Sequence, residues 1–322
     1  MIGVDVGGTK VAVGLVDSEG NIQARSRFPM AATGNASEGL KAVTSAIDSL
    51  FTKDLSIKNA VRGIGICSPG PLDPITGTVI NPPNLPCWRN FPLAAEALRL
   101  YGVPVKVDND ANAAALAEVL WGAGRGFRNV FYTCIGTGIG SGIVFDGHIY
   151  HGRTGAAAEG GHVSIDYGGP RCGCGKAGCI EILASGPAIA KRAREKLSAH
   201  PERESAILNL ANGSLELISS EMVGQAYAQG DLLAKEILQE TVELLAVWLG
   251  NIIDLLEPDV VIIGAGVGSM LKPFFQDIRE HLPSWCINSR AQEIPLLAAH
   301  YGADSGIAGG AALCWTISST PS

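Results

Sequence analysis

The chain has 322 residues, which exceeds the usual size of one domain, so it can bury two hydrophobic cores. Its formal net charge is −7 and it contains no run of Lys and Arg, which argues against a nucleic acid or an anionic membrane as the main partner. The most hydrophobic stretch, residues 242–256, contains Glu243, Asn251 and Asp254, so we expect no membrane span.

The N-terminal residues and the cysteines favour a cytoplasmic protein. Residues 1–5 read directly as the start of a strand, without the charged and apolar leader of a secreted chain. The eight cysteines are dispersed, which is typical of thiols and metal ligands in a reducing compartment and not of a disulfide framework.

The first part of the chain predicts a mixed sheet flanked by helices. Five stretches have the apolar pattern of strands, the first three forming a meander: residues 2–6, 11–16, 21–28, 61–67 and 103–107. Three stretches have helical spacing: residues 37–51, 92–101 and 111–121. The Pro- and Gly-rich residues 68–88 form a long loop, and such loops in compact proteins usually carry function.

The strand pattern begins again near residue 130, which indicates a duplicated chain. Residues 130–135, 142–145 and 148–151 repeat the opening meander, and residues 142–149 echo residues 14–22. Further helices are predicted at 187–199, 205–210, 221–229, 231–256 and 306–315, with a buried strand at 260–264.

Two glycine turns occupy equivalent places in the two halves. The first consists of Gly7, Gly8, Thr9 and Lys10, and the second of Gly136, Thr137 and Gly138. Each lies between two strands, so neither is a Walker A loop. Glycine lets backbone amides approach phosphate oxygens. One such turn is weak evidence, but two in equivalent places predict a pair of phosphate-binding turns.

Carboxylates follow two of the predicted strands. Asp5 ends the first strand and is placed to hold Mg²⁺ through water, although a turn-capping Asp is the simpler alternative. Asp108, Asn109 and Asp110 stand where a strand meets a helix. One of them suffices as an N-cap, so the set carries more polarity than capping needs.

The segment from Glu159 to Glu181 predicts a structural zinc site. His162 and the glycine-interleaved Cys172, Cys174 and Cys179 form a complete tetrahedral ligand set. The alternative is a set of buried thiols with a core histidine, which gives no reason for the glycines. Glu159 and Glu181 remain free to bind hydroxyl groups of a polar ligand.

A third glycine turn follows the strand at 260–264. Gly264, Gly266 and Gly268 stand between that strand and a probable helix, in the manner of a nucleotide-binding turn. A dinucleotide fingerprint is disfavoured, because no acidic residue follows about twenty positions later in a second strand.

Four of these motifs follow one another along the chain, at residues 5–10, 108–112, 136–140 and 159–181. In this order they resemble the ROK family (repressors, open reading frames and kinases), most closely its bacterial glucokinases. The resemblance covers essentially the whole chain and implies an α/β, two-domain, actin-like (ribonuclease-H-like) ATPase fold with duplicated mixed sheets around a cleft. We therefore expect a small domain at 1–108, a large domain at 109–305 with the zinc motif, and a C-terminal helix within 306–322 that packs back on the first domain.

The resemblance also implies roles for single residues. Asp110 is implied as the general base, and Gly264 and Gly266 as contacts of the adenosine part of ATP. Positions matching sugar contacts of the family are Gly70, Asn84, Asn109, Asp110, Glu159, His162 and Glu181. The family usually has an aliphatic residue where this chain has Gly160.

We expect an ATP- and Mg²⁺-dependent kinase that converts glucose to glucose 6-phosphate, and the family suggests a homodimer. The alternatives are an N-acetylglucosamine, N-acetylmannosamine or fructose kinase. A sugar-responsive transcriptional regulator is remote, since regulators carry an N-terminal helix-turn-helix for which this sequence leaves no room. A non-catalytic sugar-binding protein is disfavoured by Asp110 together with both glycine turns.

Overall fold

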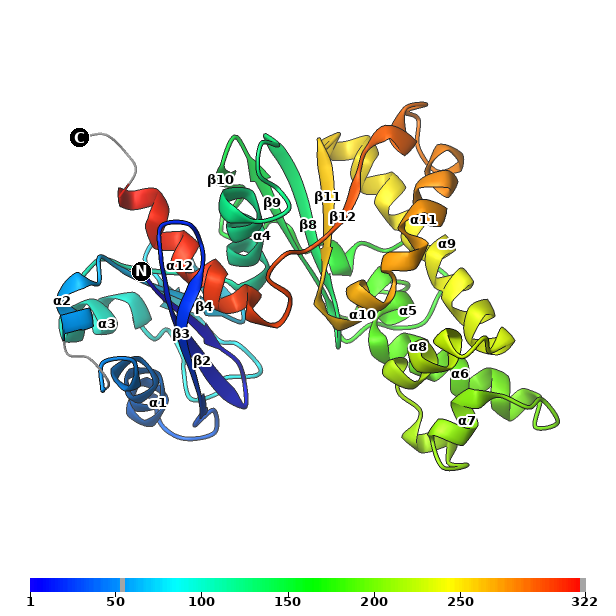
Figure 1. The fold of residues 1–322 in the computed structure, drawn as a ribbon, viewed down its shortest axis with the longest axis horizontal. Coiled ribbons are helices and arrows are strands. Elements are labelled where there is room, and N and C mark those ends of the chain that lie inside the picture. The colour runs from blue at the N-terminus through cyan, green and yellow to red at the C-terminus, as the bar shows by residue number, and fades with distance from the viewer. Residues whose placement is uncertain (53–55, 319–322) are drawn as a thin grey trace. The chain divides into compact units, whose positions relative to one another are not determined.

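The computed structural model describes residues 1–52 and 56–318 (Figure 1). Contacts between residues divide the chain into two compact units: residues 1–132, 142–158 and 300–322 in the first, and residues 133–141 and 159–299 in the second. The predicted boundary between residues 108 and 109 differs from this division, which keeps residues 109–132 with the first unit.

The first unit contains a five-stranded mixed sheet of order β3-β2-β1-β4-β7. The strands are β1 (Ile2–Val6), β2 (Lys10–Val16), β3 (Ile22–Pro29), β4 (Ile64–Ser68) and β7 (Val105–Asn109). Strand β2 is antiparallel to both β1 and β3, whereas β1, β4 and β7 are parallel. The opening meander is therefore confirmed, and the carboxyl ends of three parallel strands meet at one edge.

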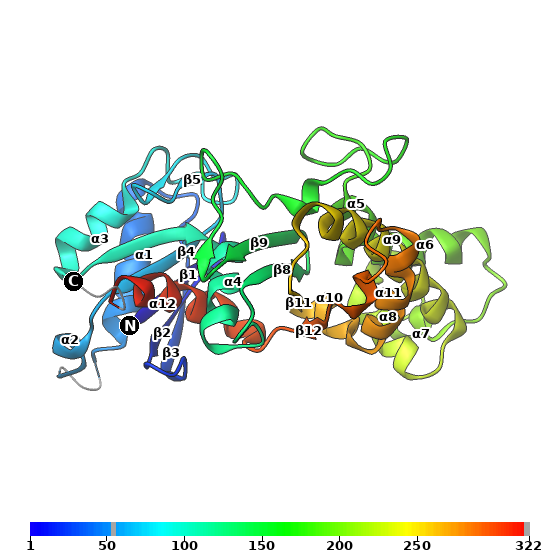
Figure 2. The same ribbon diagram turned by 90° about the horizontal axis from the view of Figure 1, so that it is seen from above.

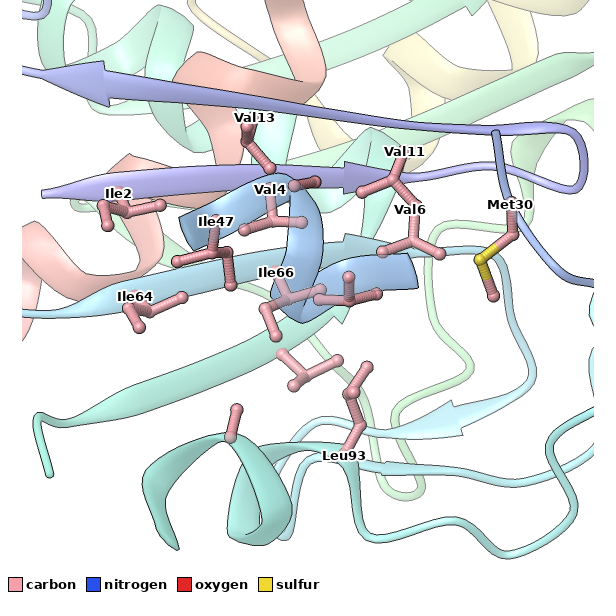
Figure 3. Close-up of a cluster of buried hydrophobic side chains, with 14 of the residues drawn as sticks. Ile2, Val4, Val6, Val11, Val13, Met30, Ile47, Ile64, Ile66 and Leu93 are labelled. Atoms are coloured by element: carbon pink, nitrogen blue, oxygen red, sulfur yellow. The ribbon is translucent and has the colours of Figure 1, made fainter. Parts of the chain in front are cut away.

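One face of this sheet is apolar and is covered by helix α1 (Ala36–Ser49). Val4, Val13 and Ile66 are completely buried there, with Ile47 of the helix packed over them (Figure 3). The pattern follows from strand geometry, in which alternate side chains point to the same face. Further elements of this unit are α2 (Ser56–Ala60), β5 (Leu72–Asp73), β6 (Thr78–Val79), α3 (Leu93–Tyr101), α4 (Asp110–Trp121) and β10 (His148–Ile149).

The opposite face of the first sheet carries helix α12 (Ser305–Ser318). A Cβ on Gly3 would lie 1.8 Å from the Ile307 carbonyl oxygen, and one on Gly65 would lie 1.7 Å from that of Gly310. Only glycine permits such an approach, so the helix lies directly on β1 and β4. Residues 319–322 of the predicted C-terminal helix lie outside the described residues.

A second five-stranded sheet has the order β10-β9-β8-β11-β12. It adds β8 (Asn129–Ile135), β9 (Ile139–Phe145), β11 (Val260–Gly264) and β12 (Leu296–Ala298), and β11 is parallel to β12. Three consecutive strands followed by two later ones repeat the order of the first sheet. The predicted duplication of an α/β mixed sheet is confirmed.

Helices make up most of the second unit. They are α5 (Ile180–Ala184), α6 (Gly186–Ala199), α7 (Ala206–Leu210), α8 (Ser220–Ala228), α9 (Leu232–Leu256), α10 (Ala265–Met270) and α11 (Phe275–His281). Helix α9 contacts α5, α6, α8 and α11 and forms the centre of this group (Figure 2). Among the described helices, none is long and apolar enough to cross a bilayer.

Candidate active site

Two carboxylates lie at the carboxyl edge of the first sheet. Asp5 is the penultimate residue of β1, and Asp110 follows β7 as the first residue of α4. The Asn109 side chain caps this helix by accepting the Ala111 N–H at 2.9 Å. Since Asn109 supplies a cap, α4 does not depend on Asp110 alone, although its Oδ1 also accepts the Ala111 N–H, at 2.8 Å.

The charge of Asp110 affects the protonation of Asp5. Desolvation raises the pKa of Asp5, and the negative charge of Asp110 raises it further, while Lys10 and Arg27 act in the opposite direction. Asp110 is reached by solvent, yet the protein atoms around it withdraw enough water to raise its pKa as well. Two oxygen-rich, desolvated acids suit a hard divalent cation and the acceptance of a proton.

Asp108 lies on the other side of the same strand end. It is 4% exposed, and its Oδ2 lies 2.6 Å from Nε2 of His151. Its Oδ1 accepts hydrogen bonds from the Asn109 N–H and the Asn112 amide. Asp108 is therefore engaged within the first unit, which leaves Asp110 as the carboxylate available for chemistry.

The first glycine turn adjoins these carboxylates. The Gly7 N–H donates to the Lys10 carbonyl at 2.9 Å, and Thr9 and Lys10 are exposed. A Cβ on Gly8 would lie 2.9 Å from the Asn84 carbonyl oxygen, so the turn packs on the long loop. One on Gly70 would lie 3.9 Å from the Asn109 amide nitrogen. The structure thus brings Gly70 next to Asn109, and Asn84 next to the turn.

The second glycine turn borders a cavity of about 510 Å³ in the second unit. The turn is closed by a 2.9 Å bond from the Gly136 N–H to the Gly138 carbonyl, and the Gly136 carbonyl accepts the Gly186 N–H that begins α6. The cavity is lined by Gly136, Thr137, Gly186, Pro187, Ala190, Arg194, Ile218, Ser219, Ser220, Glu221, Gly266 and Val267. Its size suits a nucleoside, and glycine amides and hydroxyls suit phosphate.

The turn after β11 contributes Gly266 to the lining of this cavity. Gly264, two residues earlier, is the N-cap residue of α10. Ala265 between them has a φ of 65°, a left-handed conformation that is unusual for a residue other than glycine. The sequence motifs did not predict Arg194, Ser219 and Ser220 as part of this wall. The local sequence signal for this wall is Ser185-Gly186-Pro187, a helix start whose glycine packs against the second glycine turn.

The four predicted metal ligands come together. One ligand atom from each of His162, Cys172, Cys174 and Cys179 lies within 4.8 Å of the others. The Cys172 Sγ is 3.7 Å from Nδ1 of His162, and the Cys174 and Cys179 sulfurs are 3.6 Å apart. A tetrahedral site with Zn–S bonds of about 2.3 Å requires ligand separations of this size, so the set fits zinc.

Glu181 joins the metal-ligand cluster to the second glycine turn. Its Oε2 accepts the Ile139 N–H at 3.0 Å, and its Oε1 lies 4.0 Å from Nδ1 of His162. A Cβ on Gly138 would lie 2.6 Å from this carboxylate. Glu159 directly precedes the 3₁₀ turn Gly160–His162, and the carbonyl of Glu159 accepts a hydrogen bond from the His162 N–H.

Comparison with known proteins agrees with this arrangement. The sequence matches the ROK family over residues 1–317. It is 34% identical to a glucokinase of Streptomyces coelicolor, over 97% of this chain and 96% of that protein, and 33% identical to an N-acetylmannosamine kinase of Vibrio vulnificus, over 83% of each.

Among solved structures, a ROK family glucokinase from Streptomyces griseus, in complex with glucose and AMPPNP, is 35% identical and superposes with a TM-score of 0.80 over 97% of both chains. This similarity confirms the fold predicted for the family, with its duplicated mixed sheets. The chain belongs to the ROK family.

Proposed function

We propose that this protein is an ATP-dependent sugar kinase that phosphorylates the 6-hydroxyl of glucose. The observation that carries the proposal is the solvent-reached Asp110 carboxylate, whose charge acts on Asp5 at the first glycine turn, in a chain similar to a glucokinase over 97% of its length. A structurally similar ROK glucokinase is described with glucose and AMPPNP, which supports glucose as acceptor and ATP as donor.

Asp110 is assigned as the general base. A sugar hydroxyl is a poor nucleophile, so a carboxylate within hydrogen-bond reach accepts its proton as the phosphoryl group is transferred. Desolvation raises the pKa of Asp110, which strengthens its carboxylate as a base. Asp5 would hold Mg²⁺, which neutralises charge on the phosphates when bound.

The remaining residues bind the two substrates. Amides of Gly7, Gly8, Gly136 and Gly138, with Thr9, Lys10 and Thr137, are assigned to phosphate oxygens, and Gly264 and Gly266 to the adenosine. Hexose hydroxyls are assigned to Gly70, Asn84, Asn109, Asp110, Glu159, His162 and Glu181. Nδ1 of His162 faces the sulfurs, so its Nε2 is left to donate to a hydroxyl.

The cluster of His162 and three cysteines would hold a structural zinc. Four ligands complete a tetrahedron and leave no open position, so we assign zinc to stability and not to catalysis. Because Glu181 contacts both this cluster and the Ile139 amide, loss of the metal would displace a hexose ligand. The homodimer suggested by the family stays a prediction.

A second candidate substrate is N-acetylmannosamine, since a kinase for that sugar is 33% identical to this chain. A panel of glucose, mannose, N-acetylglucosamine, N-acetylmannosamine and fructose with ATP and Mg²⁺, followed by ADP release, separates the candidates. Glucose should give the highest kcat/KM, because a site built for each hydroxyl rejects altered sugars. A better N-acetylated sugar or fructose would overturn the glucose assignment, and turnover of no sugar would overturn the kinase assignment.

A further inference from the structure

The peptide groups of Gly160 are held by two side chains that the proposed chemistry does not use. The indole Nε1–H of Trp248, on α9, donates to the Gly160 carbonyl at 3.0 Å. Oγ of Ser141, on β9, accepts the Gly160 N–H at the same distance. Gly160 lies between Glu159 and His162, so both side chains act on the segment that presents these two residues.

The space beside Gly160 is filled by these same residues. Trp248 is completely buried and Ser141 is 5% exposed. A Cβ on Gly160 would lie 2.4 Å from Oγ of Ser141 and 3.3 Å from Cζ2 of Trp248. The indole thus packs where a larger residue 160 would project, and the small residue and the large ring complement each other.

Strand β9 also binds Glu181, which is assigned to the hexose together with Glu159 and His162. A Cβ on Gly161 would lie 1.8 Å from the Ile139 carbonyl oxygen, so the segment runs directly against the strand. The Ile139 N–H binds the Glu181 carboxylate at 3.0 Å. The segment with Glu159 and His162 and the side chain of Glu181 therefore all contact the first residues of β9. Ser141 and Trp248 hold the Glu159–His162 segment in place through Gly160.

We propose that Trp248 and Ser141 are positioning residues for hexose recognition, which set the orientation of Glu159 and His162 by clamping Gly160 against β9. This proposal rests on the proposed function, because the hexose role of Glu159 and His162 is assigned there. Neither clamp residue is among those assigned to a substrate, and both bind Gly160, so we assign their effect to the segment they hold.

The first test is Trp248→Phe, which keeps a ring in the core and removes the N–H donor. Losing one buried hydrogen bond that orients the segment should raise the KM for glucose about fivefold to tenfold. The kcat and the KM for ATP should change less than twofold, since the residues assigned to ATP and to proton transfer keep their contacts.

A second variant covers the case in which Trp248→Phe does not fold. Ser141→Ala removes only the oxygen that accepts the Gly160 N–H, and it should raise the glucose KM in the same way. The matched control is Thr241→Val, on the same helix. Thr241 is completely buried and accepts a hydrogen bond from Arg192 of α6. It lies about two turns before Trp248 and is not one of the side chains that hold Gly160, so its loss should lower Tm without changing the glucose KM.

The outcomes separate this proposal from the function it rests on. If the unaltered enzyme phosphorylates a hexose and both variants keep its KM, the clamp is refuted and the kinase stands. If Thr241→Val raises the KM as much as Trp248→Phe, or if kcat falls by as large a factor as the KM rises, the role is merely structural and the clamp is refuted too. An unaltered enzyme without hexose turnover would overturn both.

Discussion

The two glycine turns stand in sheets of the same strand order but in different chemical surroundings. The first follows β1 and adjoins the carboxylates of Asp5 and Asp110, and desolvation together with the charge of Asp110 raises the pKa of Asp5. The second follows β8, and at the position equivalent to Asp5, two residues before the first glycine, this half has Cys134. Its turn borders a cavity with glycines and hydroxyls.

This contrast shows how duplication separates two tasks. The backbone device, an amide-rich turn between strands, is retained in both sheets because it depends only on glycine and strand pairing. The side chains around it diverged. Paired acids suit a cation and a proton, whereas a cavity lined by glycines, hydroxyls and Arg194, with Glu221 as its carboxylate, suits a nucleotide. We therefore assign acceptor chemistry to the surroundings of the first turn and donor binding to those of the second.

The largest loss of activity is expected when the metal-ligand cluster is disrupted, because Glu181 joins this cluster to the second glycine turn. Cys172→Ala should lose bound zinc and essentially all activity, because structural zinc contributes directly to local folding and Glu181 would leave the turn. Metal analysis and an ADP-release assay on one preparation check this. Cys286→Ala, a cysteine outside the cluster, should retain both zinc and activity, and a fully active zinc-free Cys172→Ala would refute the site.

A smaller effect is expected at the cavity wall. Gly186→Ala places a Cβ 2.9 Å from Oγ of Ser220 and 3.1 Å from the Gly136 carbonyl, so the second turn must shift. Overpacking of this kind should raise the KM for ATP roughly tenfold and leave the KM for glucose unchanged. Initial rates with each substrate varied in turn measure both constants. A change confined to glucose would reverse our division of tasks.

The smallest effect concerns stability at the first turn. Because the folded-state pKa of Asp5 is raised, the folded protein binds more protons than the unfolded chain, and stability falls as pH rises from about 4 through that pKa. Asp5→Asn should remove this decline and raise Tm at pH 7 by about 2–4 °C. Thermal melts across this pH range test it, and a lower Tm for the variant at pH 7 would contradict the sign.

Asp73 provides a comparison of opposite sign. The Thr76 hydroxyl holds the pKa of Asp73 below its usual value, so its contribution is present at neutral pH and is lost as pH falls. Asp73→Asn should therefore lower the Tm of the protein slightly at pH 7 but leave it unchanged at low pH. Melts of the two Asn variants side by side distinguish desolvation at the turn from a general effect of removing acids.

The features predicted from sequence are those that local patterns determine. The meander and the repeat depend on spacing within short segments, and the structure confirms them. The four predicted metal ligands depend on such spacing too, and their ligand atoms lie within 4.8 Å of one another. The predicted loop at 68–88 in fact contains the short β5–β6 hairpin. Residue roles assigned through the family stay predictions.

The cavity wall was not predictable in the same way. Arg194 lies in the middle of α6, where its sequence reads as an ordinary solvated helix, and Ser219 reads only as the N-cap of α8. The pairing of Gly160 with Trp248 joins residues 88 positions apart. Such contacts depend on how helices pack, which no local periodicity encodes.

The central claim, that Asp110 is the base beside the first turn, is tested most directly by Asp110→Asn. Since Asn109 supplies a cap for α4, the fold should persist. We predict that calorimetry shows glucose binding within a fewfold of the unaltered protein, while turnover with ATP and Mg²⁺ falls at least about a hundredfold. Near-normal turnover would contradict the assignment of Asp110, and with it the division of chemistry between the two turns.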